Sequence, residues 1–180
     1  VGSEGFDVPV AVATSPEAEA EAQRQRELSW LVWDLHFGVE PGVPGYFDLV
    51  DSAQLERIRS LAPTDRVVAG LDIYPISINA VGGERPDWVP SDLIRLAADE
   101  IERWHDRYGH PFWIAETSNL TLPLDEQILW LDEFAQALGR LRAKGRPARG
   151  LCWYSRGDQF DWQTALIEPT GAVTEVGLFD

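Results

Sequence analysis

The sequence predicts an α/β fold in which parallel strands alternate with helices. Short, continuously apolar segments alternate along the chain with longer segments whose hydrophobic residues recur at helical spacing, and this order is typical of parallel βαβ units. Polar residues follow directly after successive predicted strands. The 180 residues suit a single domain, and a hydrophobic content of 44% is enough to build a core.

The first predicted strand is the β-branched and alanine-rich run at 6–14. A helix follows it directly, because Ser15 is a good N-cap, Pro16 suits the first helical position, and Glu17 favours the positive end of the helix dipole. We expect this helix to continue toward Trp33 and to end in an apolar, aromatic segment.

The remaining elements continue the alternation. We predict helices at 52–61, 92–108 and 124–144, strands at 66–74, 112–115 and 148–154, and a long loop at 76–90. Ser91 is the expected N-cap of the helix at 92–108, and Gly109 is its expected stop. The last helix should bury a stripe of apolar residues at helical spacing, namely Ile128, Leu131, Phe134, Leu138 and Leu141.

Polar and aromatic residues mark the ends of three predicted strands. Asp72 and Tyr74 end one strand, Glu116 follows the next, and Trp153 ends the last. In an α/β barrel the C-terminal ends of the strands build the active site. Glu116 is therefore a candidate nucleophile, base or metal ligand, although an ordinary loop carboxylate fits the position equally well. Four strands are half of the eight that close a barrel of about 250 residues, so we predict half of a TIM (β/α)8 barrel.

The composition excludes several classes of function. A formal net charge of −15 repels phosphates, so we expect no nucleic acid partner and no membrane partner. No apolar run is long enough to span a bilayer, and we find no signal peptide. A single cysteine excludes an internal disulfide, and we take the cytoplasm as the default location. The sequence begins at Val1 without any methionine, which indicates a fragment, a processed chain or a trimmed start.

Other chemistries find little support in the sequence. No glycine-rich phosphate loop follows a predicted strand, which disfavours nucleotide binding. His36, His105 and His110 are scattered, so we expect no metal site and no cofactor. Ser118 and Ser155 have no histidine motif nearby, which disfavours a serine triad. Most of the eight tryptophans should be core residues, although some suit stacking on sugar rings.

Several segments, in the right order, resemble the family 1 glycoside hydrolases and their wider clan of (β/α)8 retaining glycosidases. The segment at 70–74, Gly-Leu-Asp-Ile-Tyr, is similar to the family's sixth-strand Gly-Leu-Asn-Tyr-Tyr. The segment at 114–118, Ile-Ala-Glu-Thr-Ser, is similar to the seventh-strand Ile-Thr-Glu-Asn-Gly. The segment at 153–162 is similar to the eighth-strand Trp-Ser-Leu-Leu-Asp-Asn-Phe-Glu-Trp, and the turn at 44–46 is a weaker match to Gly-x-Tyr-Pro. The resemblance covers most of the chain but only the C-terminal half of a family barrel.

The resemblance implies a role for each matching residue. Glu116 takes the position of the nucleophile, and Tyr74 takes that of the tyrosine that hydrogen-bonds the nucleophile. Trp153 takes the position of the tryptophan that lines the sugar site. Asp161 and Trp162 take those of the Glu-Trp pair that holds sugar hydroxyls. The implied ligand is a carbohydrate or glycoside.

The chain also departs from the family pattern. Asp72 replaces an asparagine, Thr117–Ser118 replaces Asn-Gly, and Asp161 replaces a longer glutamate, with one extra residue after the first tryptophan. We include Asp72, Asn119 and Asp158 as further candidate substrate-binding residues.

The family's Asn-Glu-Pro acid/base segment is absent from the sequence. A retaining glycosidase needs two carboxyl groups about 5 Å apart, so we expect the acid/base to come from elsewhere or to be missing. A half barrel also leaves sheet edges unpaired. We therefore predict that residues 1–180 form one (β/α)4-like unit, completed by a second polypeptide half, by missing N-terminal sequence or by another copy of the chain.

Three functions stay open at this point. The first is a retaining β-glycosidase-like hydrolase in which Glu116 is the nucleophile. The second is a non-catalytic half barrel that binds carbohydrate or serves a structural role. The third is a different (β/α) hydrolase in which Glu116 is a base. The sequence leaves open whether this chain alone is an enzyme.

Overall fold

Parallel strands form the centre of the molecule. The computed structural model describes residues 3–61, 67–120 and 122–179. In this part of the chain, four parallel strands form one sheet in the order β1-β3-β5-β6. Their bounds are β1 Ser3–Gly5, β3 Ala69–Asp72, β5 Phe112–Thr117 and β6 Ala148–Trp153. The prediction of parallel strand–helix repeats is confirmed.

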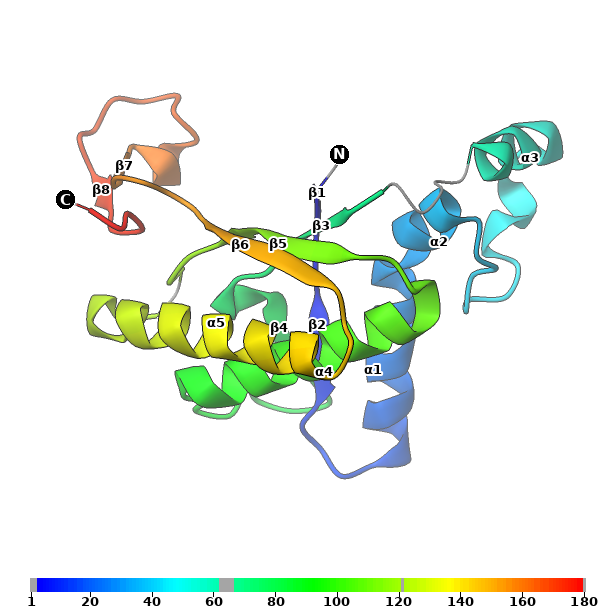
Figure 1. Cartoon of the computed structure of the whole chain (residues 1–180), viewed down its shortest axis with the longest axis horizontal. Coiled ribbons are helices and arrows are strands. Elements are labelled where there is room, and N and C mark those ends of the chain that lie inside the picture. Colours follow the sequence, from blue (N-terminus) through cyan, green and yellow to red (C-terminus); the bar gives the residue numbers. More distant parts are fainter. Residues whose placement is uncertain (1–2, 62–66, 121, 180) are drawn as a thin grey trace.

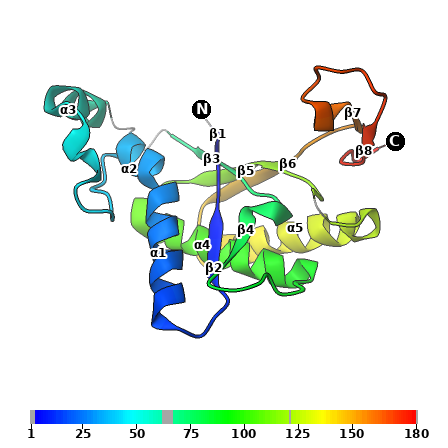
Figure 2. The ribbon, with the colours of Figure 1, turned by 180° about the vertical axis from the view of Figure 1, so that it is seen from behind.

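Helices connect these strands. The two helices α4 (Pro90–Tyr108) and α5 (Gln127–Ala143) pack side by side along one face of the sheet (Figure 1). Helix α1 (Pro16–Ser29) runs beside the β1–β2 segment, as the view from behind shows (Figure 2). The other helical elements are α2 Leu31–Phe37, α3 Ser52–Ser60 and the 3-10 turns η1 Tyr46–Leu49, η2 Pro75–Ser77, η3 Leu124–Glu126 and η4 Trp162–Thr164.

The strand predicted at 6–14 is wrong in its bounds. After β1 the chain continues into β2 (Val8–Ala11), which pairs in parallel with β4 (Ile78–Val81) inside the segment that we predicted as a loop. Pro75 starts the turn η2, which separates β4 from β3. Pro9 has no N–H to donate, and it is tolerated because β2 has a strand partner on one side only within the described residues. The predicted start of the second strand at Arg66 lies outside the described residues.

Two helix boundaries also differ from prediction. The helix expected to reach Trp33 is divided at Trp30 into α1 and α2. Helix α4 begins at Pro90, one residue before the expected N-cap Ser91, because the fixed φ angle of proline suits the first helical position. The predicted N-cap of α1 is confirmed, since the Ser15 hydroxyl accepts a backbone hydrogen bond from the first turn at 3.1 Å.

Helix α5 buries part of its predicted stripe. Phe134, Leu138 and Leu141 are buried, but Ile128 is 78% exposed. The structure buries Trp130 in its place. Positions 130, 134, 138 and 141 recur every three or four residues and share one face, whereas position 128 falls on the opposite side of the helix.

Aromatic side chains fill the space between α2, α4 and β5. Trp33 stacks on Phe37 with ring centroids 5.8 Å apart and meets Trp104 edge-on at 5.4 Å. Trp104 in turn contacts Tyr108 at 5.2 Å and Phe112 at 6.1 Å. Edge-to-face pairs of this kind add stabilisation beyond the apolar area that they bury. This cluster ties the first helices to the sheet.

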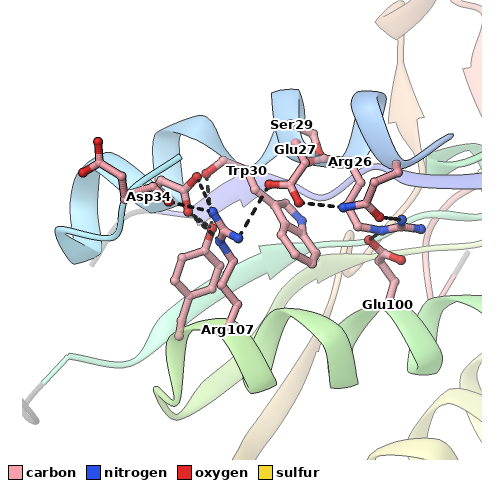
Figure 3. Close-up of polar contacts among 10 residues, drawn as sticks. Arg26, Glu27, Ser29, Trp30, Asp34, Glu100 and Arg107 are labelled. Atoms are coloured by element: carbon pink, nitrogen blue, oxygen red, sulfur yellow. Dashed lines mark hydrogen bonds and ion pairs between the residues drawn. The ribbon is translucent and has the colours of Figure 1, made fainter. Parts of the chain in front are cut away.

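Buried ion pairs fasten α1 and α2 to α4 (Figure 3). Asp34 is fully buried, and it accepts hydrogen bonds of 2.7 and 2.9 Å from the Arg107 guanidinium and of 2.7 Å from the Tyr108 hydroxyl. Glu100, also fully buried, lies between Arg26 and Arg103. Buried carboxylates of this kind depend on their partners, because an unpaired charge in the interior is costly.

The sheet ends at β1 on one side and at β6 on the other. Within the described residues neither of these strands has a partner on its outer edge. Along β6, buried or partly buried Ala148 and Leu151 pack toward the helices, while Arg149 and Cys152 are exposed. Unpaired edges are ready templates for further strands, and the sheet can therefore be extended at both ends.

Candidate active site

The ends of two neighbouring strands bring Glu116 and Tyr74 together. Strand β5 pairs with β3 so that Asp72 lies beside Glu116 in the register, and the Ile73 amide donates to the Glu116 carbonyl at 3.0 Å. Thr117 faces the helices, where its hydroxyl accepts from the Trp130 indole at 3.0 Å. Because side chains alternate along a strand, Glu116 points to the opposite face.

The Tyr74 hydroxyl donates a 2.7 Å hydrogen bond to Oε2 of Glu116. Burial raises the pKa of Tyr74 well above its ordinary value, and the hydrogen bond and negative charge of Glu116 raise it further. The tyrosine therefore stays protonated and holds one carboxylate oxygen in place.

Both residues open into a pocket of about 280 Å³. It is a concave, largely aromatic and aliphatic site with a few polar groups, as is typical of small-ligand sites. Its lining consists of Tyr74, Glu116, Ser118, Leu120, Tyr154, Gln159, Trp162, Thr174 and Val176. A larger hollow of about 620 Å³ lies between β2, α1 and α4, where Arg26 and Glu100 line it, away from this chemistry.

Trp162 is the predicted sugar-contacting residue that the structure brings to the pocket. Its ring is half exposed and lies 6.2 Å from the ring of Tyr154. Tyr154 was missed by the sequence analysis, although the motif contains a signal for it. Counted backward from Trp162, the segment Tyr154–Trp162 has nine residues, the same length as the family's eighth-strand motif, so the extra residue disappears when Tyr154 takes the first position.

Three other predicted residues hold the C-terminal tail instead of lining the pocket. The Trp153 indole donates to the Val176 carbonyl at 2.9 Å, and the Asn119 amide donates to the Glu175 carbonyl at 3.2 Å. Asp158 accepts from the Gly177 amide at 2.9 Å. These contacts fix the tail that supplies Val176 and Thr174 to the pocket wall.

The two remaining predicted residues also lie outside the pocket lining. Asp161 turns into its own loop, where its Oδ1 accepts hydrogen bonds from the hydroxyl and amide of Thr170 and from the amides of Gly171 and Ala172. The Thr170 hydroxyl, together with these amides, lowers the pKa of Asp161. Asp72 is half-buried beside Glu116 in the sheet register.

Two further searches concern metals and membranes. Among the described residues, no group of three or more histidine, cysteine, aspartate or glutamate side chains is placed to hold a metal ion. None of the helices in that part of the chain combines the length and apolar character needed to cross a bilayer.

Known proteins give a consistent picture of the fold. The sequence matches no family model and no curated protein. Among solved structures, a β-glucosidase from Exiguobacterium marinum has a TM-score of 0.72 at 18% identity over 97% of this chain. The family 1 β-glucosidase from Thermotoga maritima has a TM-score of 0.71 at 13% identity, also over 97% of this chain. A family 1 β-glucosidase from Exiguobacterium antarcticum has a TM-score of 0.68 at 17% identity over 88% of this chain.

This chain spans less than half of the structures that it matches. It covers 44% of the Exiguobacterium marinum and Thermotoga maritima chains and 42% of the Exiguobacterium antarcticum chain. The fold is thus a partial (β/α) barrel similar to part of a family 1 β-glucosidase. The resemblance stated from the motifs is confirmed at the level of the fold.

Proposed function

We propose that this chain is the C-terminal half of a retaining β-glycosidase-like barrel in which Glu116 is the nucleophile. The observation that carries the proposal is the hydrogen bond from Tyr74 to Glu116 inside a pocket that also contains Trp162. The residues matched by the family motif at two separate strand ends meet at one point in space. A carboxylate held by a tyrosine beside an aromatic wall suits attack on a bound sugar.

In the proposed reaction, one Glu116 oxygen attacks the anomeric carbon as the bond to the leaving oxygen breaks. A general acid protonates the leaving oxygen, and a covalent glycosyl-enzyme forms. Water, deprotonated by the same group, then attacks the anomeric carbon and releases Glu116. Tyr74 orients the carboxylate through its hydrogen bond in both steps.

The general acid must come from outside this set of residues. Among the described residues that line the pocket, Glu116 is the only carboxylate, and the mechanism needs a second one about 5 Å away. The open edges of β1 and β6 are where further strands would attach. We propose that a further half barrel, on a second polypeptide, on a longer form of this chain or on a second copy, completes the site.

The alternative function is a non-catalytic half barrel that binds carbohydrate. The absence of a second pocket carboxylate among the described residues favours it.

The cytoplasm stays our proposed compartment, because the single cysteine allows no internal disulfide.

The substitution Glu116→Gln tests the proposal. It keeps the size of the side chain but removes the nucleophilic oxygen. We therefore expect the protein, assayed together with the half barrel that completes the site, to lose turnover of a 4-nitrophenyl β-glycoside. A 2-deoxy-2-fluoroglycosyl inactivator should label Glu116, as read by mass spectrometry of the digested protein. Glu56→Gln, on the exposed face of α3, is the matched control and should leave turnover unchanged.

Each outcome selects one function. Turnover that depends on Glu116 supports the glycosidase. Glycoside binding without turnover in any form of the protein, including its complex with co-purifying polypeptides, supports the binding half barrel. Turnover that survives Glu116→Gln contradicts the assignment of the nucleophile.

A further inference from the structure

One wall of the pocket is a two-stranded ribbon. Strand β7 (Gln159–Phe160) pairs antiparallel with β8 (Val173–Thr174), and Gln159 lies directly opposite Thr174. Both of these residues line the pocket, whereas the next pair in the ribbon, Phe160 and Val173, is exposed. Because side chains alternate along a strand, the two pairs lie on opposite faces of the ribbon. Gln159 and Thr174 thus form its pocket face.

The carboxylate that follows β7 in the chain holds the ribbon together. Oδ1 of Asp161 accepts hydrogen bonds from the Thr170 amide at 2.8 Å, the Thr170 hydroxyl at 2.7 Å, the Gly171 amide at 2.6 Å and the Ala172 amide at 3.2 Å. These contacts close the loop between β7 and β8. Asp161 is not among the residues that line the pocket, so a polar contact from this wall to a ligand comes from other side chains.

The side-chain amide of Gln159 has both of its hydrogens in use. Its nitrogen donates to the Ser155 hydroxyl at 2.7 Å and to the Gly157 carbonyl at 3.3 Å. A carbonyl oxygen can only accept, so the amide nitrogen, and not the amide oxygen, lies on that side. The Ser155 hydroxyl itself donates to the Gly157 carbonyl, and it therefore accepts from Gln159. Among the described residues, Oε1 of Gln159 has no donor, so Gln159 offers the pocket a hydrogen-bond acceptor.

The Thr174 hydroxyl complements this acceptor. It has no hydrogen-bond partner within the described part of the chain, and a hydroxyl group can both donate and accept. Residues directly opposite each other in an antiparallel pair have Cβ atoms about 4.5–5.5 Å apart, so one ligand oxygen can reach both side chains. A sugar hydroxyl matches the pair, because it has one hydrogen to donate and two lone pairs that accept.

We propose that Gln159 and Thr174 hold one hydroxyl group of the bound sugar between them. The sugar hydroxyl donates to Oε1 of Gln159 and accepts from the Thr174 hydroxyl. This assignment rests on the proposed function, because it takes the ligand beside Glu116 to be a glycoside. A wall that binds a hydroxyl selects against an analogue that lacks it, since the groups of the wall are then left unpaired. Gln159 and Thr174 are therefore specificity-determining residues.

The experiment is a cycle of protein and ligand changes, followed by isothermal titration calorimetry on the protein together with the half barrel that completes the site. The ligands are methyl β-D-glucopyranoside and its 2-, 3-, 4- and 6-deoxy analogues. We expect the unsubstituted protein to bind one analogue at least fivefold more weakly than the glucoside. Thr174→Val removes the hydroxyl with little change of volume. It should weaken binding of the glucoside at least fivefold and change binding of that one analogue less than twofold, because two changes to one contact are not additive.

The outcomes separate the assignment from the proposed function. Any other pattern among ligands that bind overturns the role of the Gln159–Thr174 pair and leaves the proposed function in place. Two examples are losses that add for every analogue, and glucoside binding that Thr174→Val changes less than twofold. Failure of all five ligands to bind the unsubstituted protein overturns both.

Two further variants and one further ligand test each side chain separately. Thr174→Ser keeps the hydroxyl and should bind the glucoside within twofold of the unsubstituted protein. Val173→Thr, on the exposed face of the same ribbon, is the matched control and should leave every dissociation constant unchanged. Fluorine in place of the sensitive hydroxyl cannot donate to Gln159, so the fluoro sugar should bind as weakly as the deoxy sugar. Recovery of binding with fluorine would contradict the role of Gln159. Melting temperatures of all variants check that the fold is retained.

Discussion

The Tyr74 hydroxyl and the Glu116 carboxylate, 42 positions apart in the sequence, are joined by a hydrogen bond of 2.7 Å. Each residue lies at the C-terminal end of a parallel strand, and the two strands are neighbours in the sheet. Parallel strands direct their C-terminal ends to one edge, which is where ligands bind in such folds. The topology of the sheet therefore brings the two side chains together.

Removal of the Tyr74 hydroxyl should impair the chemistry more than the fold. In Tyr74→Phe, Glu116 loses the hydrogen-bond donor that orients its carboxylate. For the completed glycosidase that we propose, we expect kcat/KM to fall by roughly 10²-fold, the loss typical of one preorganised donor. Steady-state kinetics with a 4-nitrophenyl β-glycoside measures the fall. Unchanged kcat/KM at an unchanged melting temperature would show that the hydrogen bond has no part in turnover.

Stability should decline at alkaline pH. Burial and the neighbouring carboxylates Glu116 and Asp34 raise the pKa values of Tyr74 and Tyr108 in the folded protein, whereas an unfolded tyrosine titrates near 10. Above about pH 10 the unfolded state binds fewer protons than the folded state, so the free energy of unfolding falls as pH rises. Urea denaturation at pH 8 to 11 measures this decline. In Tyr108→Phe the free energy of unfolding should decline less steeply with pH. An identical slope in that variant would refute tyrosine titration at position 108 as a source of the decline.

Two adjacent aromatic residues should have separable roles. Tyr154 lines the pocket, whereas the Trp153 indole donates to the Val176 carbonyl at 2.9 Å. We expect Tyr154→Ala to weaken glycoside binding about tenfold through lost ring contact. Trp153→Phe should lower the free energy of unfolding by about 1 kcal/mol, the cost of one hydrogen bond. Isothermal titration calorimetry measures the effect on glycoside binding, and urea denaturation measures the effect on the free energy of unfolding. The reverse pattern would restore Trp153 as the sugar contact.

The C-terminal tail should tolerate no side chain at Gly177. A Cβ atom there would lie 2.6 Å from the Asp158 nitrogen and 2.6 Å from the Gly157 carbonyl carbon, both of which belong to the backbone. Gly177→Ala should therefore displace the tail, cost about 1–3 kcal/mol of stability and weaken glycoside binding.

Gly139→Ala on α5 is the matched control for the tail, because nothing lies within 4 Å of the added Cβ. It should stabilise the helix by up to about 1 kcal/mol. Urea denaturation and ligand titration follow both variants. Equal stability of the two would mean that the tail can shift freely.

The buried Asp34 should be the most sensitive polar residue of the fold. Asp34→Ala removes the buried carboxylate that accepts hydrogen bonds from the Arg107 guanidinium and the Tyr108 hydroxyl, and breaking a buried pair typically costs about 3–5 kcal/mol. Urea denaturation measures the free energy of unfolding of this variant. The control is Glu56→Ala, an exposed surface change that should alter the free energy of unfolding by no more than about 0.5 kcal/mol. A loss below about 1 kcal/mol for Asp34→Ala would show that the pair is dispensable.

The order of the elements could be read from the sequence. The apolar runs, the Ser15 cap and the Gly109 stop are local signals, and they predicted alternating strands and helices correctly. The resemblance to the family 1 motifs implied that Tyr74 hydrogen-bonds Glu116, and the structure contains that hydrogen bond. Local propensity is sufficient for the order of the elements, because neighbouring residues largely determine it, whereas the pairing of Tyr74 with Glu116 was implied by the resemblance to the family motifs.

Tertiary structure decided what local patterns cannot express. The split of the first strand into β1 and β2 depends on its two different partners, β3 and β4. The choice of Tyr154 over Trp153 for the pocket depends on which face of the strand end meets the helices and the tail. Asp161 faces its own loop because the amides of Gly171 and Ala172, ten and eleven residues later in the chain, return to it. Each outcome is set by contacts between segments distant in sequence, and their free energy is determined only when the chain has folded.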